Sequence, residues 1–234
     1  MSKVFQGTTT NNVTELTLQN EGGNIGTQTI VWDDTQGTID QVLGDIPDNW
    51  KNGDFSLKQL QIGSSCTSIG DNAFNNCSGL SGTLIIPNSV TTIGFASIQL
   101  CTGLTGLVIG NNVTTIGSAA FYFSSNLTGD LIIPDSVTTI GDTNFGSAVF
   151  AGCAFTNITI GQNVTFIGDW SFGFNSGLTN VNCYITKTII DARDQVFLNN
   201  SNFTLHARSS DNTWTAGAGQ SIGGATNVTV IKDL

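Results

Sequence analysis

The chain has 234 residues, of which 39% are hydrophobic and only 10% are charged, and its formal net charge is −10. This length suits one domain or one repeat array and is enough to bury a sizeable core. No Lys or Arg occurs between Gln59 and Thr186, so that stretch cannot neutralise phosphate groups. The composition therefore argues against nucleic acid and an anionic membrane surface as partners.

The sequence shows no recognisable targeting or membrane-spanning segment. Its first residues, MSKVFQGTTTNNV, lack the apolar core of a secretory leader, and no apolar run approaches the length of a membrane span. We therefore expect no membrane insertion. The protein is expected either to act where it is made or to leave the cell as part of something larger.

Residues 1–58 are predicted to form an N-terminal cap. Two segments, 13–19 and 27–32, alternate apolar and polar residues as strands do. Thr38 is expected to begin a short helix that ends at Pro47, because Gln41 follows Thr38 at the spacing of a capping box. The apolar face of this helix, which would seal the array that follows, would carry Ile39, Val42, Leu43 and Ile46.

A repeat occupies residues 59–208. The dipeptide Ile-Gly recurs at spacings of 24, 23, 24 and 27 residues, at Ile69, Ile93, Ile116, Ile140 and Ile167. The units begin LQIGSSCTSIG, LIIPNSVTTIG, LVIGNNVTTIG, LIIPDSVTTIG and ITIGQNVTFIG. Self-similarity at a short fixed period is the signature of a solenoid, in which each turn buries its apolar side chains against its neighbours.

Each unit predicts the same structural positions. A short strand supplies two core residues and ends at Gly or Pro, and the VTTI segment supplies Val and Ile on the opposite wall. One large apolar residue per unit is expected to fill the centre: Phe74, Ile98, Phe121, Phe150 and Phe172.

This pattern resembles the BspA-like leucine-rich repeats, whose consensus runs roughly L-x-I-P-x-S-V-T-x-I-G-x-x-A-F-x-x-C-x-x-L. The match extends from Leu60 to about Tyr184. The resemblance implies a β-rich solenoid, a leucine-rich repeat right-handed superhelix with a parallel β-sheet, short turns or helices, and a cap at each end. It also implies a role in binding or surface adhesion, because such repeats are associated with surface adhesion and with bacteriophage genomes.

Three features lie outside the regular units. About five extra residues fall around Thr143 to Ala148, where simple length drift is favoured over a binding loop. A degenerate sixth unit is expected around Phe197, because Asp194-Gln-Val-Phe197 resembles Asp71-Asn-Ala-Phe74. Residues 209–234 are predicted to form a C-terminal cap, with a Gly-rich loop and a last strand.

The residues that could carry chemistry favour structural roles. All five cysteines fall at inward positions of the repeat, so we expect buried thiols without disulfides or zinc, and no cofactor: Cys66, Cys77, Cys101, Cys153 and Cys183. His206, the single histidine, has no Ser or Cys motif beside it. Asp71, Asp142 and Asp169 share the position after Ile-Gly, where a carboxylate is expected to accept backbone N–H groups.

The candidate binding face is the outward column of the strand, which alternation turns away from the core. Along the stack this column reads Gln61, Ile85, Val108, Ile132, Thr159 and Asn182. The three apolar residues in its middle could contact a partner. They could equally serve only to stabilise a parallel sheet, since β-branched residues favour strands.

The sequence predicts a non-enzymatic binding or structural module whose partner is a protein or a cell-surface ligand. A bacteriophage virion surface component (decoration, fibre or tail-associated) or an adhesin is the favoured function. The expected location is a virion or an extracellular surface reached without a signal peptide, and copies of the chain or other virion proteins could be further partners. The alternative is a cytoplasmic scaffold for protein–protein interaction. No motif points to an enzyme.

Overall fold

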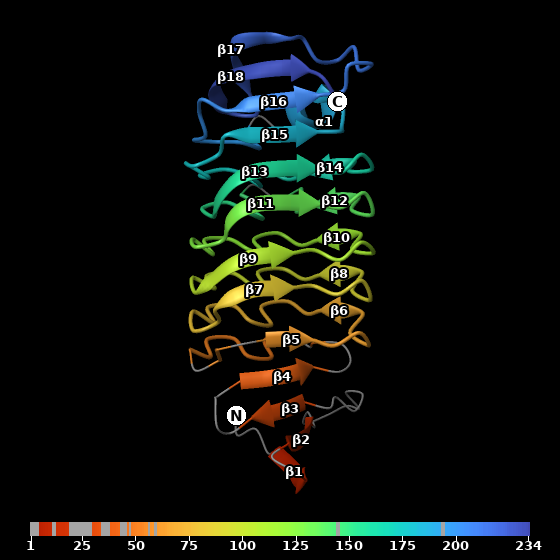
Figure 1. Cartoon of the computed structure of the whole chain (residues 1–234), viewed down its shortest axis with the longest axis vertical. Helices are drawn as coiled ribbons and strands as arrows, with labels where there is room; N and C mark the ends of the chain where they lie inside the picture. Colours follow the sequence, from red (N-terminus) through yellow and green to blue (C-terminus); the bar gives the residue numbers. More distant parts are fainter. Residues whose placement is uncertain are drawn as a thin grey trace.

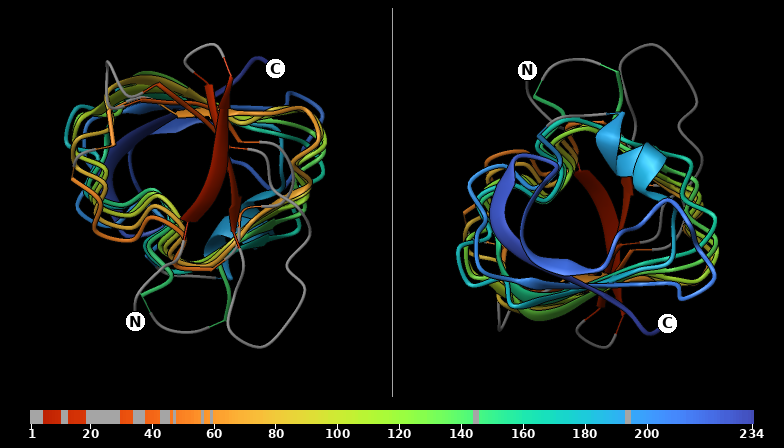
Figure 2. Two further views of the ribbon diagram at one scale, coloured as in Figure 1. Left: turned by 90° about the horizontal axis from the view of Figure 1, so that it is seen from below. Right: turned by 90° about the horizontal axis from the view of Figure 1, so that it is seen from above.

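The computed structural model is a stack of short turns (Figure 1). It describes residues 5–10, 13–18, 30–33, 38–42, 46, 48–55, 57–58, 60–143, 146–192 and 195–234. Viewed along the stack, successive turns follow nearly the same closed outline (Figure 2). The chain is therefore a β-solenoid, as the repeat predicts, and it has about seven turns, one more than the six predicted units.

Four sheets contain the strands of the described residues. The first holds β1 (Phe5–Thr10), β2 (Val13–Leu18), β3 (Ile30–Asp33), β4 (Thr38–Val42) and β5 (Leu60–Ile62). The second holds β6 (Ser68–Ile69), β8 (Thr92–Ile93), β10 (Thr115–Ile116), β12 (Thr139–Ile140) and β14 (Phe166–Ile167). β7 (Gly82–Ile85) and β9 (Leu104–Val108) form a pair. The last sheet holds β11 (Thr128–Ile133), β13 (Ala154–Ile160), β15 (Asn180–Cys183), β16 (Thr204–Ala207), β17 (Gly217–Ile222) and β18 (Ala225–Lys232). A short helix, α1 (Lys187–Asp191), follows β15.

The VTTI segments form one wall of the solenoid in strict register. The isoleucine of each Ile-Gly dipeptide pairs in parallel with that of the next turn, from Ile69 to Ile167. The first Thr of the segment donates its hydroxyl proton to a backbone oxygen of the turn before, as Thr114 does to Thr91 at 3.1 Å and Thr138 to Thr114 at 3.2 Å. These bonds occupy the carbonyl groups at the corner, so threonine at this position ties adjacent turns together.

The predicted central column is the core of the stack. All five predicted residues are fully buried, and Phe197 of the sixth unit continues the column. The rings of Phe121 and Phe150 stack at 5.1 Å between centroids, and those of Phe150 and Phe172 stack at 5.7 Å. The rings stack because equivalent residues recur once per turn, at a rise that matches the contact distance of offset aromatic rings.

The predicted helix that begins at Thr38 is wrong where the structure describes it, because Thr38–Val42 is strand β4; Leu43 and Pro47 lie outside the described residues. β4 pairs antiparallel with β3 and parallel with β5. Thr, Ile and Val favour an extended backbone, and the first repeat strand needs a hydrogen-bonding partner on its open side. Tertiary pairing therefore prevails over the local capping signal, whereas the strands predicted at 13–19 and 27–32 overlap β2 and β3.

Ile46 and residues 48–55 already follow the path of a repeat. Ile46 is buried and forms a bridge with Ile69. Asn49, Lys51 and Gly53 donate their N–H groups to backbone oxygens of the next turn at 2.6–2.7 Å. The first turn of the array is thus covered by a segment with the same backbone geometry.

Six successive turns each have two corner residues with positive φ, four positions apart. The earliest pairs are Asn49 with Gly53 and Asn72 with Asn76, residue types that tolerate a left-handed backbone. Later pairs place other residues there: Ala96 with Leu100, Ala119 with Phe123, Ala148 with Gly152, and Trp170 with Phe174. An L-residue other than Gly, Asn or Asp in this conformation costs roughly 1–2 kcal/mol.

Candidate binding face

The predicted outward column does lie on the surface in its N-terminal half. Gln61 is exposed, and Ile85, Val108 and Ile132 are exposed by 58%, 50% and 61%. Thr159 and Asn182 are half-buried. The register pairs Ile85 with Val108, and pairs Ile132 with Thr159 and Thr159 with Asn182. We call these six residues the strand face.

The strand face spans more than one hydrogen-bonded sheet. β5 belongs to the N-terminal sheet, β7 pairs with β9, and β11 begins the C-terminal sheet. Glycines in left-handed conformation, Gly82 and Gly129, stand in β7 and β11, where the pairing shifts register. The column is therefore continuous in space, whereas the sheet that carries it is divided.

The same column continues beyond Asn182 to two residues outside the predicted six. Asn182 pairs with His206 of β16, and His206 pairs with Ile231 of β18, which is 40% exposed. Both strands are recognisable in the sequence as TLHA and as TVIK. Aligning them in register with NVNC would have revealed the extension, because residues at equivalent strand positions share one face.

Polar side chains form several contacts near the C-terminal end of the column. His206 Nδ1 lies 2.9 Å from Oδ2 of Asp233. The Arg208 guanidinium lies 5.7 Å from the centre of the Tyr184 ring and donates to Oε1 of Gln162 at 2.7 Å. These contacts tie the last strands to their neighbours, which fits the structural role predicted for His206.

The aspartates after Ile-Gly act differently from one another. Asp71 Oδ1 accepts the backbone N–H of Phe95 at 2.6 Å. The acceptor function was predicted, but the donor belongs to the next turn. Asp142 does not share the structural position of Asp71: the N–H of Ala119 reaches the oxygen of Ser147. The extra residues thus lie between Gly141 and Ser147, and Ser147 returns the chain to the repeat.

The five cysteines are buried free thiols, as predicted from their inward positions. Desolvation raises the pKa of Cys77 to about 11 and that of Cys183 to about 12, and raises the pKa values of Cys101 and Cys153 further. Thiols with raised pKa values are poor nucleophiles at neutral pH, because the thiolate is the reactive form.

The Cys position of the repeat also supplies a hydrogen-bond donor, which the sequence pattern did not predict. In each turn this side chain donates to the backbone oxygen of the central residue one turn earlier. The pairs are Cys101 to Phe74 at 3.1 Å, Ser124 to Ile98 at 2.8 Å, Cys153 to Phe121 at 3.3 Å, Asn175 to Phe150 at 3.0 Å and Asn200 to Phe172 at 2.7 Å. Because Cys, Ser and Asn can all donate, the position tolerates these three residues and satisfies carbonyls that are buried.

Changing Ser124 to Ala is expected to lower the free energy of unfolding by about 2–3 kcal/mol. The change leaves the buried oxygen of Ile98 and the N–H of Cys101, which Ser124 Oγ accepts at 3.2 Å, without their partner. Urea denaturation measures the loss. The exposed neighbour Ser125 is the matched control, and S125A should change stability by less than about 0.5 kcal/mol. Equal losses for the two variants would contradict the donor role.

Neither a metal centre nor a membrane helix is found in the described ranges. No three His, Cys, Asp or Glu side chains there are grouped so that they could hold a metal ion. None of the helical residues that the structure describes form a segment with the length and hydrophobicity that crossing a membrane requires.

Known structures with the same fold are bacterial leucine-rich repeat proteins. A leucine-rich repeat protein from Eubacterium ventriosum is 21% identical with a TM-score of 0.54, and the match covers 71% of this chain and 44% of that protein. The pneumococcal vaccine antigen PcpA is 18% identical with a TM-score of 0.55, and the match covers 78% of this chain and 42% of PcpA. The T. pallidum leucine-rich repeat protein TpLRR is 20% identical with a TM-score of 0.51, and 69% of this chain and 80% of that one are covered. The chain thus spans less than half the length of the first two.

The sequence comparison agrees with the fold. Among curated proteins, none matches the chain. The family model described as the BspA type leucine-rich repeat region matches residues 44–148 and 143–215, in six copies. Together these two ranges cover most of the sequence, including the turn at 46–55 and the degenerate sixth unit. The chain belongs to the BspA-type leucine-rich repeat family.

Proposed function

We propose that this protein is a non-enzymatic binding module that presents its strand face to a protein or a cell-surface ligand. The observation that carries the proposal is the exposure of Ile85, Val108 and Ile132, each by half or more, in three consecutive turns. Family membership supports a binding role, because solenoids of this type present extended surfaces rather than catalytic clefts. Consecutive apolar side chains on one face favour association with a partner.

The surroundings of these three residues suit close contact. On the same side of the strands, two positions earlier, lie Thr83 and Gly106, and a Cβ at Gly106 would come within 2.7 Å of the Thr83 hydroxyl oxygen. Pro87 and Gly110 follow the apolar residues at the other end of the strands. Compact residues at these positions leave the apolar side chains accessible. Because Lys and Arg are absent from Gln59 to Thr186, the only charged side chains near the face are acidic.

We further propose that the module works on the surface of a particle, as a bacteriophage virion component, or on a cell surface as an adhesin. The support for the virion is compositional: the chain is rich in Gly, Thr and Asn and poor in Lys, as phage structural proteins are. Such a module would act from a multi-chain assembly, where many weakly binding faces add to a strong attachment.

The test replaces Ile85, Val108 and Ile132 together by Thr. Thr keeps β-branching and strand propensity while the apolar area is lost, so the melting temperature should shift by only a few degrees. Binding of the labelled protein to purified virions and to host cells is measured by sedimentation. We expect binding to fall at least tenfold.

The control is Ile231→Thr, which makes the same chemical change in the same column, at its far end. This variant should bind as the unchanged protein does. If the triple variant also binds normally, the strand face serves the sheet alone and the proposal fails. If the unchanged protein binds neither virions nor host-cell surfaces but binds a partner protein inside cells, a cytoplasmic scaffold is favoured instead.

A further inference from the structure

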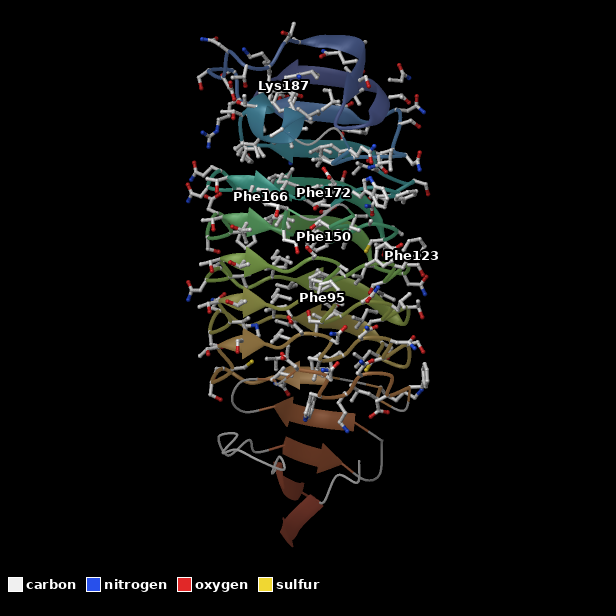
Figure 3. All side chains as sticks on the ribbon, turned by 180° about the vertical axis from the view of Figure 1, so that it is seen from behind. Phe95, Phe123, Phe150, Phe166, Phe172 and Lys187 are labelled. Atoms are coloured by element: carbon white, nitrogen blue, oxygen red, sulfur yellow. The ribbon has the colours of Figure 1, made fainter. Side chains whose placement is uncertain are left out.

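A second apolar surface lies at the corner of the turns, away from the strand face. The second left-handed position of each turn forms a column, linked by backbone hydrogen bonds from Leu100 to Tyr122, from Phe123 to Ala151 and from Phe174 to Leu198. Along the stack this column reads Asn76, Leu100, Phe123, Gly152, Phe174 and Asn199. In Figure 3, Phe123 lies at the outer edge of the ribbon, whereas Phe150 and Phe172 lie between the turns.

The residues in the middle of this column combine a strained backbone conformation with exposed apolar side chains. Leu100, Phe123 and Phe174 have φ between 52° and 59°, the region that Gly and Asn occupy most readily. Their side chains are 36–41% exposed, so core packing does not require them. Asn76 and Asn199 show that the same corner forms with a residue that tolerates the conformation. Strain kept at an exposed apolar site indicates a function.

The rings of Phe123 and Phe174 are partly exposed, and each packs against a neighbouring aromatic ring. Three ring carbons of Phe123 lie 2.8–3.0 Å from the position that a Cβ at Gly152 would occupy. Nearly equal distances mean that one face of the ring covers Gly152, and the residue is nevertheless 41% exposed. Tyr122 packs against its edge, with 4.6 Å between centroids. Trp170 packs against Phe174 at 6.5 Å in the same edge-on manner, and the Gln195 side-chain oxygen accepts its indole N–H.

The two aromatic pairs recur at a fixed interval along the axis. Phe123 and Phe174 occupy equivalent corners two turns apart, because Gly152 lies between them. Two strand spacings place these corners about 10 Å apart. The surface is therefore a narrow line parallel to the stack, with two aromatic rings two turns apart and asparagines at Asn76 and Asn199 on either side of them.

The charge and the side-chain types of this line indicate the class of ligand that it could bind. The absence of cations from Gln59 to Thr186 argues against phosphates, nucleic acid and acidic chains. Unlike the strand face, whose exposed apolar residues are aliphatic, this line exposes aromatic side chains at Phe123 and Phe174. Sugar rings have apolar C–H faces that stack on flat aromatic rings, and their hydroxyl groups pair with amides. The geometry points to a neutral polysaccharide chain lying along this line, with sugar rings on Phe123 and Phe174.

The test replaces Phe123 and Phe174 together by Asn, the residue that the chain itself uses at 76 and 199. Because Asn tolerates the left-handed backbone, the double variant should fold with unchanged or higher melting temperature. Binding is measured by native electrophoresis through gels containing glucomannan, mixed-linkage β-glucan, dextran or mannan. We expect at least one polymer to retard the unchanged protein, and the double variant to need at least tenfold more of that polymer for equal retardation.

Three further variants determine whether retardation depends on this line of rings. Phe95→Asn removes an aromatic ring that is 49% exposed but lies outside the line, and should leave retardation intact. Gly152→Ala should weaken retardation, because the added Cβ displaces the Phe123 ring. The triple strand-face variant should be retarded normally, so failure of the proposed function would leave this site standing. No retardation by any of the four polymers, or equal retardation of the double variant, overturns the inference.

Discussion

Replacing Phe150 by Ala is expected to lower the free energy of unfolding by about 4–5 kcal/mol. The ring lies between Phe121 and Phe172 in two stacked pairs, and Phe155 meets it edge-on with 6.3 Å between centroids. Alanine would lose all three contacts and leave a cavity in the middle of the array. Because turns are stabilised mainly by their immediate neighbours, the loss should uncouple the turns on either side.

Urea denaturation followed by circular dichroism measures this effect. The matched control is Phe95→Ala, which removes the same side chain from the surface and should change stability by less than about 0.5 kcal/mol. Phe150→Leu should fall between the two. A loss below about 2 kcal/mol for Phe150→Ala would contradict a continuous aromatic column as the core of the solenoid.

Raising the pH from 8 to 10 is expected to destabilise the protein by about 5 kcal/mol through its buried cysteines. Burial raises the folded-state pKa of Cys77, Cys101, Cys153 and Cys183 above the ordinary value of 9.0. Below pH 9 these thiols are neutral in both states and their contribution to stability is complete. Above pH 9 the unfolded chain loses protons that the folded chain retains, which costs about 1.4 kcal/mol per thiol and pH unit. The contribution of Cys77 levels off near pH 11 and that of Cys183 near pH 12.

The comparison variant replaces Cys77, Cys101 and Cys153 by Ser and Cys183 by Ala. Ser124 already occupies the Cys position of its own turn, so Ser keeps the hydrogen bond to the neighbouring carbonyl. The two proteins differ in no other titratable group. Denaturation under reducing conditions should give a steep fall with pH for the unchanged protein and a shallow one for the variant. Parallel pH profiles, or fast reaction of the native thiols with maleimide at pH 7, would contradict their burial.

The periodicity of the sequence was sufficient to predict the solenoid, the register of its Ile-Gly wall and the aromatic column. These features repeat from turn to turn, so the same local pattern is seen several times and a chance match can be excluded. The inward position of the cysteines followed from the same alignment. The outward column was predicted from Gln61 to Asn182, whereas its extension to His206 and Ile231 was missed, although β16 and β18 carry the strand alternation in their own sequence.

The buried residues of the repeat could be predicted from the amino-acid sequence alone, because burial follows the same period as the apolar residues in the sequence. Features that depend on neighbouring turns could not. Strand β4 forms because β5 needs a partner, although its own residues carry a helix signal. The Cys position donates to a carbonyl one turn away, and Phe123 covers Gly152, which belongs to the following turn. These contacts join residues far apart in sequence, and only the stacking of turns brings them within bonding distance.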